Sequence, residues 1–175
     1  MNLTESNFGV VILCPDLNSG GLKYTTNSIK AYFSQTQHVC TVGDNATASD
    51  VNHLSNFCQI KKCGKTITSL IDGGIKYLSK EWCLVVVSGS LVKFNIFKKY
   101  GYFAEEKDIL FPVIDKKYLF HEASINGILM KKQTYEDVGD FGDDFEDIKN
   151  VKLAWGAKAL EKGYKLKGIV GARFI

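Results

Sequence analysis

The chain has 175 residues, of which 23% are charged and 45% hydrophobic, and its formal net charge is +3. These values are typical of a soluble globular protein, and we interpret residues 1–175 as a single domain. The basic residues are scattered rather than gathered in a stripe, which argues against nucleic acid as a partner. No apolar run approaches the roughly 18 residues of a membrane span, and the first residues lack the basic segment of a signal peptide.

The five cysteines include no Cys-x-x-Cys pair. An odd number without paired spacing argues against a disulfide framework and against a zinc site, and it favours a reduced, cytoplasmic protein. Cys14 and Cys83 lie inside apolar runs, so we expect both to be core thiols.

Strands and helices alternate through the first half of the chain. We expect strands at residues 8–14, 37–42 and 57–61, and helices at residues 22–33, 47–54 and 65–79. Gly73 and Gly74 weaken the last of these helices. Such alternation predicts a parallel sheet joined by right-handed crossovers.

The stretch from Trp82 to Ser90 is the centre of this arrangement. Residues 82–87 are apolar, which is typical of a strand buried on both faces, and the run then breaks into Ser88, Gly89 and Ser90. Ligands of open α/β sheets bind at the carboxyl ends of the strands, so we expect a site at this break.

The second half is expected to add three strands and two helices. We place helices at residues 93–100 and 149–162 and strands at residues 108–114, 125–130 and 165–170. Pro112 favours an edge position for its strand, and Gly163 is a stop signal for the last helix. Trp155 lies on the apolar side of that helix and is predicted to be a core residue.

Four segments, in this order, resemble motifs of the inverting family 2 glycosyltransferases. Residues 10–15 are similar to the opening strand that ends in a proline at the nucleotide, and residues 42–48 to the segment V-D-D-G-S-T-D. Residues 62–65 and 72–75 resemble N-x-G followed by N-x-G-I. Residues 126–132 and 138–141 resemble the acceptor-side pair G-x-x-x-x-R-R and V-G-G-F.

The resemblance implies a three-layer α/β/α fold of the nucleotide-diphospho-sugar transferase (GT-A) type, with a mostly parallel mixed sheet. It also implies a nucleotide-diphosphate sugar as the donor and a glycan or other hydroxyl compound as the acceptor. The residues that would hold the donor are Cys14, Pro15, Asp16 and Asp44 at the base and ribose, Lys65 at the diphosphate, and Ser88 and Ser90 at the end of the central strand.

Two departures from the family pattern bear on activity. Ser88 and Ser90 replace the Asp-X-Asp carboxylates that bind a divalent metal, so we expect no metal ligands here and little dependence on Mg²⁺ or Mn²⁺. Asn150 stands at the expected catalytic base, which leaves Glu146 or Asp147 for that role.

Several alternatives follow from these departures and from other residues. The chain is either a glycosyltransferase or a catalytically reduced module that binds a nucleotide, a glycan or a partner protein. A nucleotidyltransferase would need a longer glycine-rich first loop than residues 20–23 provide. His121 and Glu122 form either a late metal or acid–base element or a surface pair. Residues 64–66 fail the Walker pattern, and a helix starting at Thr66 explains them better.

Overall fold

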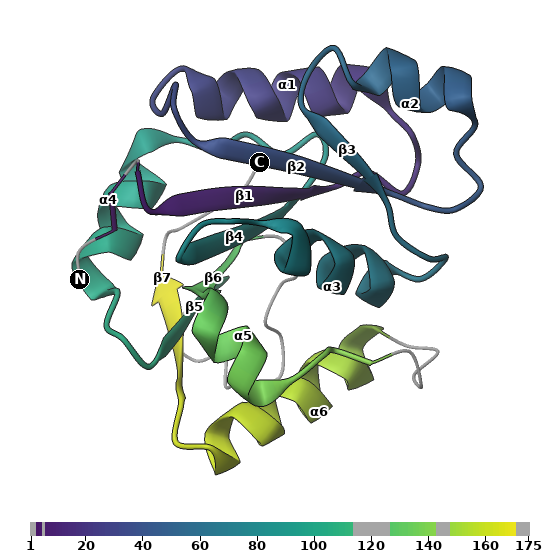
Figure 1. The fold of residues 1–175 in the computed structure, drawn as a ribbon. Helices are drawn as coiled ribbons and strands as arrows, with labels where there is room; N and C mark the ends of the chain where they lie inside the picture. The colour runs from purple at the N-terminus through teal and green to yellow at the C-terminus, as the bar shows by residue number, and fades with distance from the viewer. Residues whose placement is uncertain (1–2, 5, 114–126, 143–147, 171–175) are drawn as a thin grey trace.

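A seven-stranded sheet with helices on both faces forms the core of the molecule (Figure 1). The computed structural model describes residues 3–4, 6–113, 127–142 and 148–170. The strands are β1 (Phe8–Leu13), β2 (Gln37–Val42), β3 (Gln59–Lys62), β4 (Trp82–Val87), β5 (Asp108–Val113), β6 (Ile128–Lys131) and β7 (Lys165–Val170). The helices are α1 (Ser19–Lys30), α2 (Ala48–Leu54), α3 (Ile67–Tyr77), α4 (Phe94–Phe103), α5 (Lys132–Val138) and α6 (Ile148–Glu161).

The sheet has the strand order β3-β2-β1-β4-β6-β5-β7. Strands β1 to β4 are mutually parallel, with Phe8 opposite Trp82 where β1 and β4 meet. Strand β6 runs antiparallel between β4 and β5, and β7 pairs in parallel with β5 at the far edge. The predicted three-layer architecture with a mostly parallel mixed sheet is therefore confirmed.

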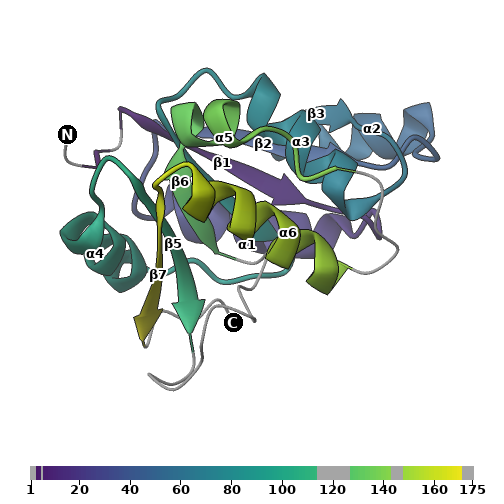
Figure 2. The same cartoon turned by 90° about the horizontal axis from the view of Figure 1, so that it is seen from below.

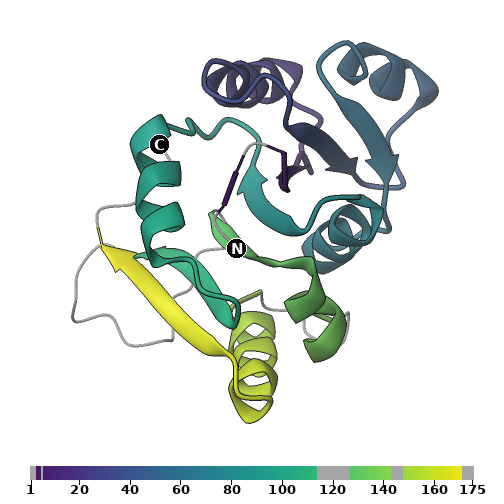
Figure 3. The same cartoon turned by 60° about the vertical axis from the view of Figure 1, so that its left-hand side comes forward.

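Two hydrophobic clusters divide the core between the faces of the sheet. Helices α1, α2 and α4 pack on one face, where Leu22 and Tyr100 are fully buried. Helices α3, α5 and α6 cover the other face, where Ile75 and Trp155 are buried. Figures 2 and 3 show α5 and α6 side by side, away from α4. The core position predicted for Trp155 is confirmed by an exposure of 4%.

Strand β4 occupies the middle of the sheet, as predicted. It pairs with β1 on one side and β6 on the other, and its residues Trp82 to Val86 have no exposed surface. Cys83 on this strand and Cys14 after β1 are both fully buried, which confirms that they are core thiols.

Close packing explains the two glycines within α3. A Cβ atom on Gly74 would lie 2.3 Å from Val11 Cγ1, and one on Gly73 would lie 2.3 Å from Cys63 Sγ. Both glycines thus let the helix approach the sheet and the β3–α3 loop more closely than a side chain would allow. Thr66 caps this helix by accepting a hydrogen bond from Ser69 N, which confirms the predicted start.

The end of α6 also follows its sequence signal. Gly163 has φ of 81°, and its N–H donates to Leu160 O while Tyr164 N donates to Ala159 O. This pair of bonds is the Schellman arrangement, in which glycine accepts a left-handed conformation without a Cβ penalty.

In the second half of the chain, one expectation was wrong and one helix was not predicted. Pro112 does not lie on an edge strand, because β5 has β6 on one side and β7 on the other. The paired residues of β6 reach only Ile109 and Leu110, however, so Pro112 itself is paired with β7 alone. Helix α5 was not expected, because its seven residues span too few turns to show a helical period.

Within the described residues, no helix is long and apolar enough to cross a membrane.

Candidate functional site

The loops after β1, β2, β3 and β4 meet at one edge of the sheet because these strands are parallel. Asp44 N donates to Gly64 O at 2.8 Å, which joins the loops after β2 and β3. Ser88 N donates to Leu13 O at 2.8 Å, which joins the end of β4 to the end of β1. The edge therefore carries the predicted residues Cys14, Pro15, Asp16, Asp44, Lys65, Ser88 and Ser90.

In the loop after β1, the Cys14 side chain is buried and the Asp16 side chain is exposed. Cys14 is fully buried, and its thiol lies 3.7 Å from Asp16 Oδ1. Asp16 Oδ1 also accepts a hydrogen bond from Asn18 N at 3.2 Å, and Asn18 caps α1 by accepting from Gly21 N at 3.0 Å. Pro15 and Asp16 are exposed, so a ligand at this edge would meet them and not the Cys14 side chain.

The Cys14 thiol sits in a polar setting for a core residue. A hydrogen bond with Cys40 lowers the pKa of Cys14, and one with Ser88 lowers it further, although burial opposes both effects. The same contact, together with a bond to Cys58 and burial, raises the pKa of Cys40. Ser88 lies against the end of β1, where its N–H donates to Leu13 O.

Asp44 and Lys65 are charged residues on the loops after β2 and β3 at this edge. Both side chains are exposed, and neither has a hydrogen-bond or ion-pair partner among the residues that the structure describes. Lys62, by contrast, is tied down because its ammonium donates to Ala46 O at 2.8 Å. An anion and a cation are therefore available on neighbouring loops, and Lys65 directly precedes the N-cap of α3.

The loop after β4 is tied to α1 and not open to the site. Gly89 N donates to Gly21 O at 3.1 Å and to Thr25 Oγ1 at 2.9 Å, and Thr25 Oγ1 donates to Ser90 O at 2.9 Å. Ser90 is only 6% exposed as a result. Sequence reasoning missed Thr25; the signal was a polar residue on the inward side of a helix.

A divalent metal of the kind that GT-A enzymes bind does not fit the residues present. Hard cations require carboxylate oxygens, whereas Ser88 has only a neutral hydroxyl and Ser90 is buried beneath α1. No group of three or more His, Cys, Asp or Glu side chains in the described part of the chain could hold a metal ion. No step of the chemistry is therefore assigned to a metal.

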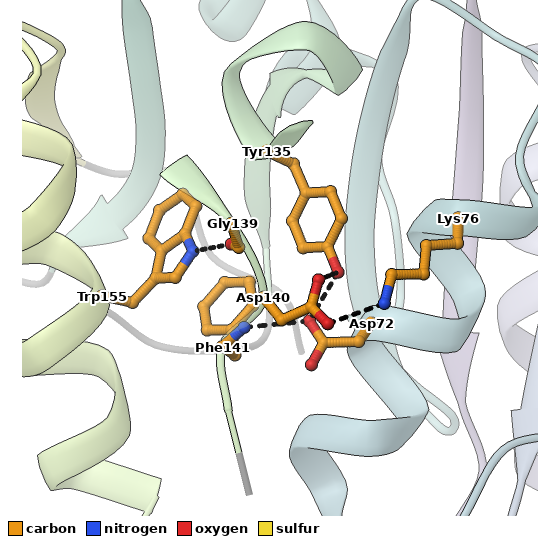
Figure 4. A network of polar contacts seen from close by, with 7 residues as sticks. All are labelled: Asp72, Lys76, Tyr135, Gly139, Asp140, Phe141 and Trp155. Carbon is orange, nitrogen blue, oxygen red and sulfur yellow. Dashed lines mark hydrogen bonds and ion pairs between the residues drawn. The ribbon is translucent and has the colours of Figure 1, made fainter. Parts of the chain in front are cut away.

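The segment Val138–Phe141, on the face covered by α3, is held by a polar network (Figure 4). Buried Asp72 accepts hydrogen bonds from Tyr135 Oη at 2.9 Å and from Phe141 N at 3.1 Å. Tyr135 Oη also lies 2.9 Å from Asp140 Oδ1, and Asp140 pairs with Lys76 at 2.7 Å. Burial raises the pKa of Asp72, whereas the hydrogen bond from Lys76 lowers the pKa of Asp140.

Helix α6 fixes the other side of this segment. Trp155 Nε1 donates to Gly139 O at 2.7 Å, and the Trp155 and Phe141 rings stack with centroids 4.5 Å apart and an angle of 10° between their planes. The backbone that leads toward residue 142 is thus anchored to α3, α5 and α6 together.

None of the residues predicted for acid–base chemistry belongs to the described part of the chain. Glu146, Asp147, His121 and Glu122 lie outside the described residues. Helix α6 begins at Ile148, so residues 146 and 147 immediately precede it in the sequence.

Comparison with known proteins identifies the fold. No family model matches the sequence, and no curated protein matches it. Among solved structures, the chain is similar to the bifunctional IspDF from Campylobacter jejuni, with a TM-score of 0.64 and 15% identity over 97% of this chain and 52% of that one. It is also similar to S. aureus TarS 1-349, with a TM-score of 0.60 and 16% identity over 95% of this chain and 59% of that one.

The fold is of the nucleotide-diphospho-sugar transferase type. Identities of 15% and 16% bear on the fold alone, and the chain spans between half and three-fifths of the length of these two structures. In open α/β sheets of this kind, ligands bind at the carboxyl ends of the parallel strands, which is the edge described above.

Proposed function

We propose that this chain binds a nucleotide-diphosphate sugar at the carboxyl edge of β1–β4 and transfers the sugar to an acceptor hydroxyl. The observation that supports this is the meeting of four loops at one edge, with the unpartnered Asp44 and Lys65 on adjacent loops. A nucleotide diphosphate offers hydroxyl and base N–H donors for a carboxylate and phosphate oxygens for an ammonium group, so both charges have a complement.

Each exposed group at the edge has a part in the proposed complex. Asp44 accepts hydrogen bonds from the base or the ribose, beside the backbone of Cys14, Pro15 and Asp16. Lys65 offsets the diphosphate charge in place of a metal, aided by the positive end of α3 that follows it. The half-buried Ser88 borders the donor, and the buried Ser90 belongs to the loop that α1 holds in place.

The proposed transfer needs one base and one leaving group. Glu146 or Asp147 takes the proton of the acceptor hydroxyl, whose oxygen forms a bond to the anomeric carbon in line with the bond to the diphosphate. That second bond breaks with its electron pair on the departing nucleotide diphosphate, and the anomeric centre inverts. In the sequence, helix α6 begins directly after these acids, at Ile148.

Calorimetry with a panel of uridine, guanosine and cytidine diphosphate sugars tests donor binding. For a donor that binds, Asp44→Ala should weaken affinity by about ten- to a hundredfold, because a charge-assisted hydrogen bond contributes about 1.5–3 kcal/mol. Glu136→Gln is the matched control, since Glu136 is an exposed acid on α5. Equal affinity of wild type and Asp44→Ala would remove Asp44 from the site.

A second candidate is a binding module without turnover. The specific observation in its favour is that Ser88 and Ser90 supply no carboxylate pair and that Ser90 is packed beneath α1. Sugar transfer and donor hydrolysis are assayed with every donor that binds. Binding without either reaction supports the module, whereas turnover that survives amide replacement of both Glu146 and Asp147 would refute the proposed base.

A further inference from the structure

A pocket lies at the opposite end of β1 from the candidate site. Its volume is about 270 Å³, and its lining residues are Leu3, Thr4, Phe8, Phe33, Phe97, Lys98 and Gly101. Phe8 is the first residue of β1, Phe33 follows α1, and the last three residues belong to α4. Figure 1 shows the start of β1 beside α4. Because β1 has six residues at about 3.3 Å each, the pocket lies roughly 15–20 Å from the carboxyl edge.

Three phenylalanine rings give this pocket a fixed apolar wall. Phe33 and Phe97 have ring centroids 4.3 Å apart, and Phe8 lies 4.9 Å from Phe97 and 5.2 Å from Phe33. Phe8 and Phe97 are buried, with exposures of 0% and 4%, so the partly exposed Phe33 ring presents most of the aromatic surface and the other two rings hold it in place. Pre-formed apolar walls of this kind are typical of small-molecule sites.

One cation complements the apolar wall. Lys98 is exposed at the pocket, none of the seven lining residues is acidic, and Lys98 has no ion-pair partner within the described ranges. An exposed lysine that lines an apolar pocket favours a ligand with an apolar body and one negative charge.

We propose that this pocket is a second ligand site, which takes a small carboxylic acid by burying its apolar body against Phe33, which Phe8 and Phe97 hold in place, and pairing its carboxylate with Lys98. A 150 Å³ cavity holds benzene, so a volume of 270 Å³ corresponds to about ten carbon atoms. The acid is therefore of medium chain length or carries a single ring. This site is independent of the donor site proposed at the carboxyl edge.

Titration with sodium octanoate tests the proposal, with 1-octanol as the uncharged probe. Calorimetry on wild type should give saturable one-to-one binding of octanoate. Gly101→Met should abolish it, because Gly101 lines the pocket and nothing lies within 4 Å of its Cβ direction. Lys98→Gln should weaken octanoate by about two- to fivefold and leave 1-octanol unchanged, as loss of an exposed ion pair predicts.

Lys93→Gln is the matched control, because Lys93 is an exposed lysine at the start of the same helix. Nuclear Overhauser contacts between octanoate methylenes and the Phe33 and Phe97 rings of wild type locate the ligand without any variant. Absence of octanoate binding, undiminished binding to Gly101→Met, or ring contacts elsewhere would overturn the site. Equal effects of Lys98→Gln and Lys93→Gln would overturn the acid as its ligand.

Discussion

His38 is a residue whose burial opposes its charge. It lies on β2 with 7% exposure, and its Nε2 has no hydrogen-bond partner in the described part of the chain. Burial, reinforced by the charge of Lys30, lowers the pKa of His38 to about 4. The imidazole is therefore neutral in the folded protein at pH 7 and is held there by its surroundings.

This makes the free energy of unfolding depend on pH. The unfolded chain binds a proton near pH 6.5, so the stability due to His38 is complete above that value and is lost as pH falls toward 4. Between pH 7 and 4.5, the free energy of unfolding measured in urea should fall by about 2–3 kcal/mol more for wild type than for His38→Leu. His53→Gln is the control at an exposed histidine. Parallel pH profiles of wild type and His38→Leu would contradict the assignment.

The Tyr135 hydroxyl contacts two carboxyl groups at once. Its hydroxyl lies 2.9 Å from an oxygen of Asp72 and 2.9 Å from an oxygen of Asp140, yet it carries one proton. A second good hydrogen bond requires a proton on one of the carboxyl groups. Burial raises the pKa of Asp72, whereas the hydrogen bond from Lys76 lowers that of Asp140, so Asp72 is the carboxyl group with the greater tendency to hold a proton.

Two variants distinguish the roles of Asp72 and Tyr135. Asp72→Asn keeps an oxygen at the Oδ1 position that can accept from both Phe141 N and Tyr135 Oη, so its free energy of unfolding should stay within about 1 kcal/mol of wild type. Tyr135→Phe removes a donor from a buried carboxyl group and should cost about 1–3 kcal/mol. Tyr24→Phe, at a half-exposed tyrosine, is the control. The reverse order of the two costs in urea denaturation would refute this account.

Among the elements, α3 depends most on its glycines. Gly74→Ala would place a methyl group 2.3 Å from Val11 Cγ1 and 3.0 Å from Thr41 Cγ2, so the helix must move away from the sheet. We expect a loss of about 1–3 kcal/mol, as for other overpacked cores. Gly101→Ala, in α4 with no atom within 4 Å, should instead gain about 0.5–1 kcal/mol. Thermal unfolding measures both, and a Gly74→Ala protein as stable as wild type would contradict the packing argument.

Features with a local sequence signal could be predicted, whereas contacts between residues far apart in the chain could not. Strand β4, the start of α3 at Thr66 and the stop at Gly163 have local signals, and these predictions are confirmed. The burial of Ser90 depends on Thr25, which lies 65 residues away, and no local pattern reports such a contact.

The candidate site follows the same division. Parallel strand order was enough to bring Asp44 and Lys65 to one edge, and the structure places both there. Asp72 is bonded to Tyr135 and Phe141, which lie 63 and 69 positions further along the chain. Sequence spacing could not predict these partners. The donor-binding and catalytic roles stay predictions until they are measured.

At the scale of the whole molecule, donor binding should be independent of divalent cations. Neutral Ser88 and Ser90 replace both expected carboxylates, and Ser90 is buried, which leaves the diphosphate charge to Lys65. Adding a chelator should leave donor affinity unchanged within error, measured by calorimetry with and without Mn²⁺. A large loss on chelation would show that metal ligands come from elsewhere, with His121 and Glu122 as the first residues to replace.

The position of β4 between β1 and β6 also has a kinetic consequence. Phe8 pairs with Trp82, and Asp108 pairs with Lys165, so both halves of the sheet depend on strands far apart in the chain. Closing such long loops costs entropy before any contact rewards it, which makes folding of parallel sheets slow. During synthesis, β1 must wait for β4, β4 exposes one side until β6 has emerged, and β5 gains its second neighbour only with β7. Nascent chains of this protein therefore present an open strand edge for most of their synthesis, and chaperone binding during that interval would limit aggregation.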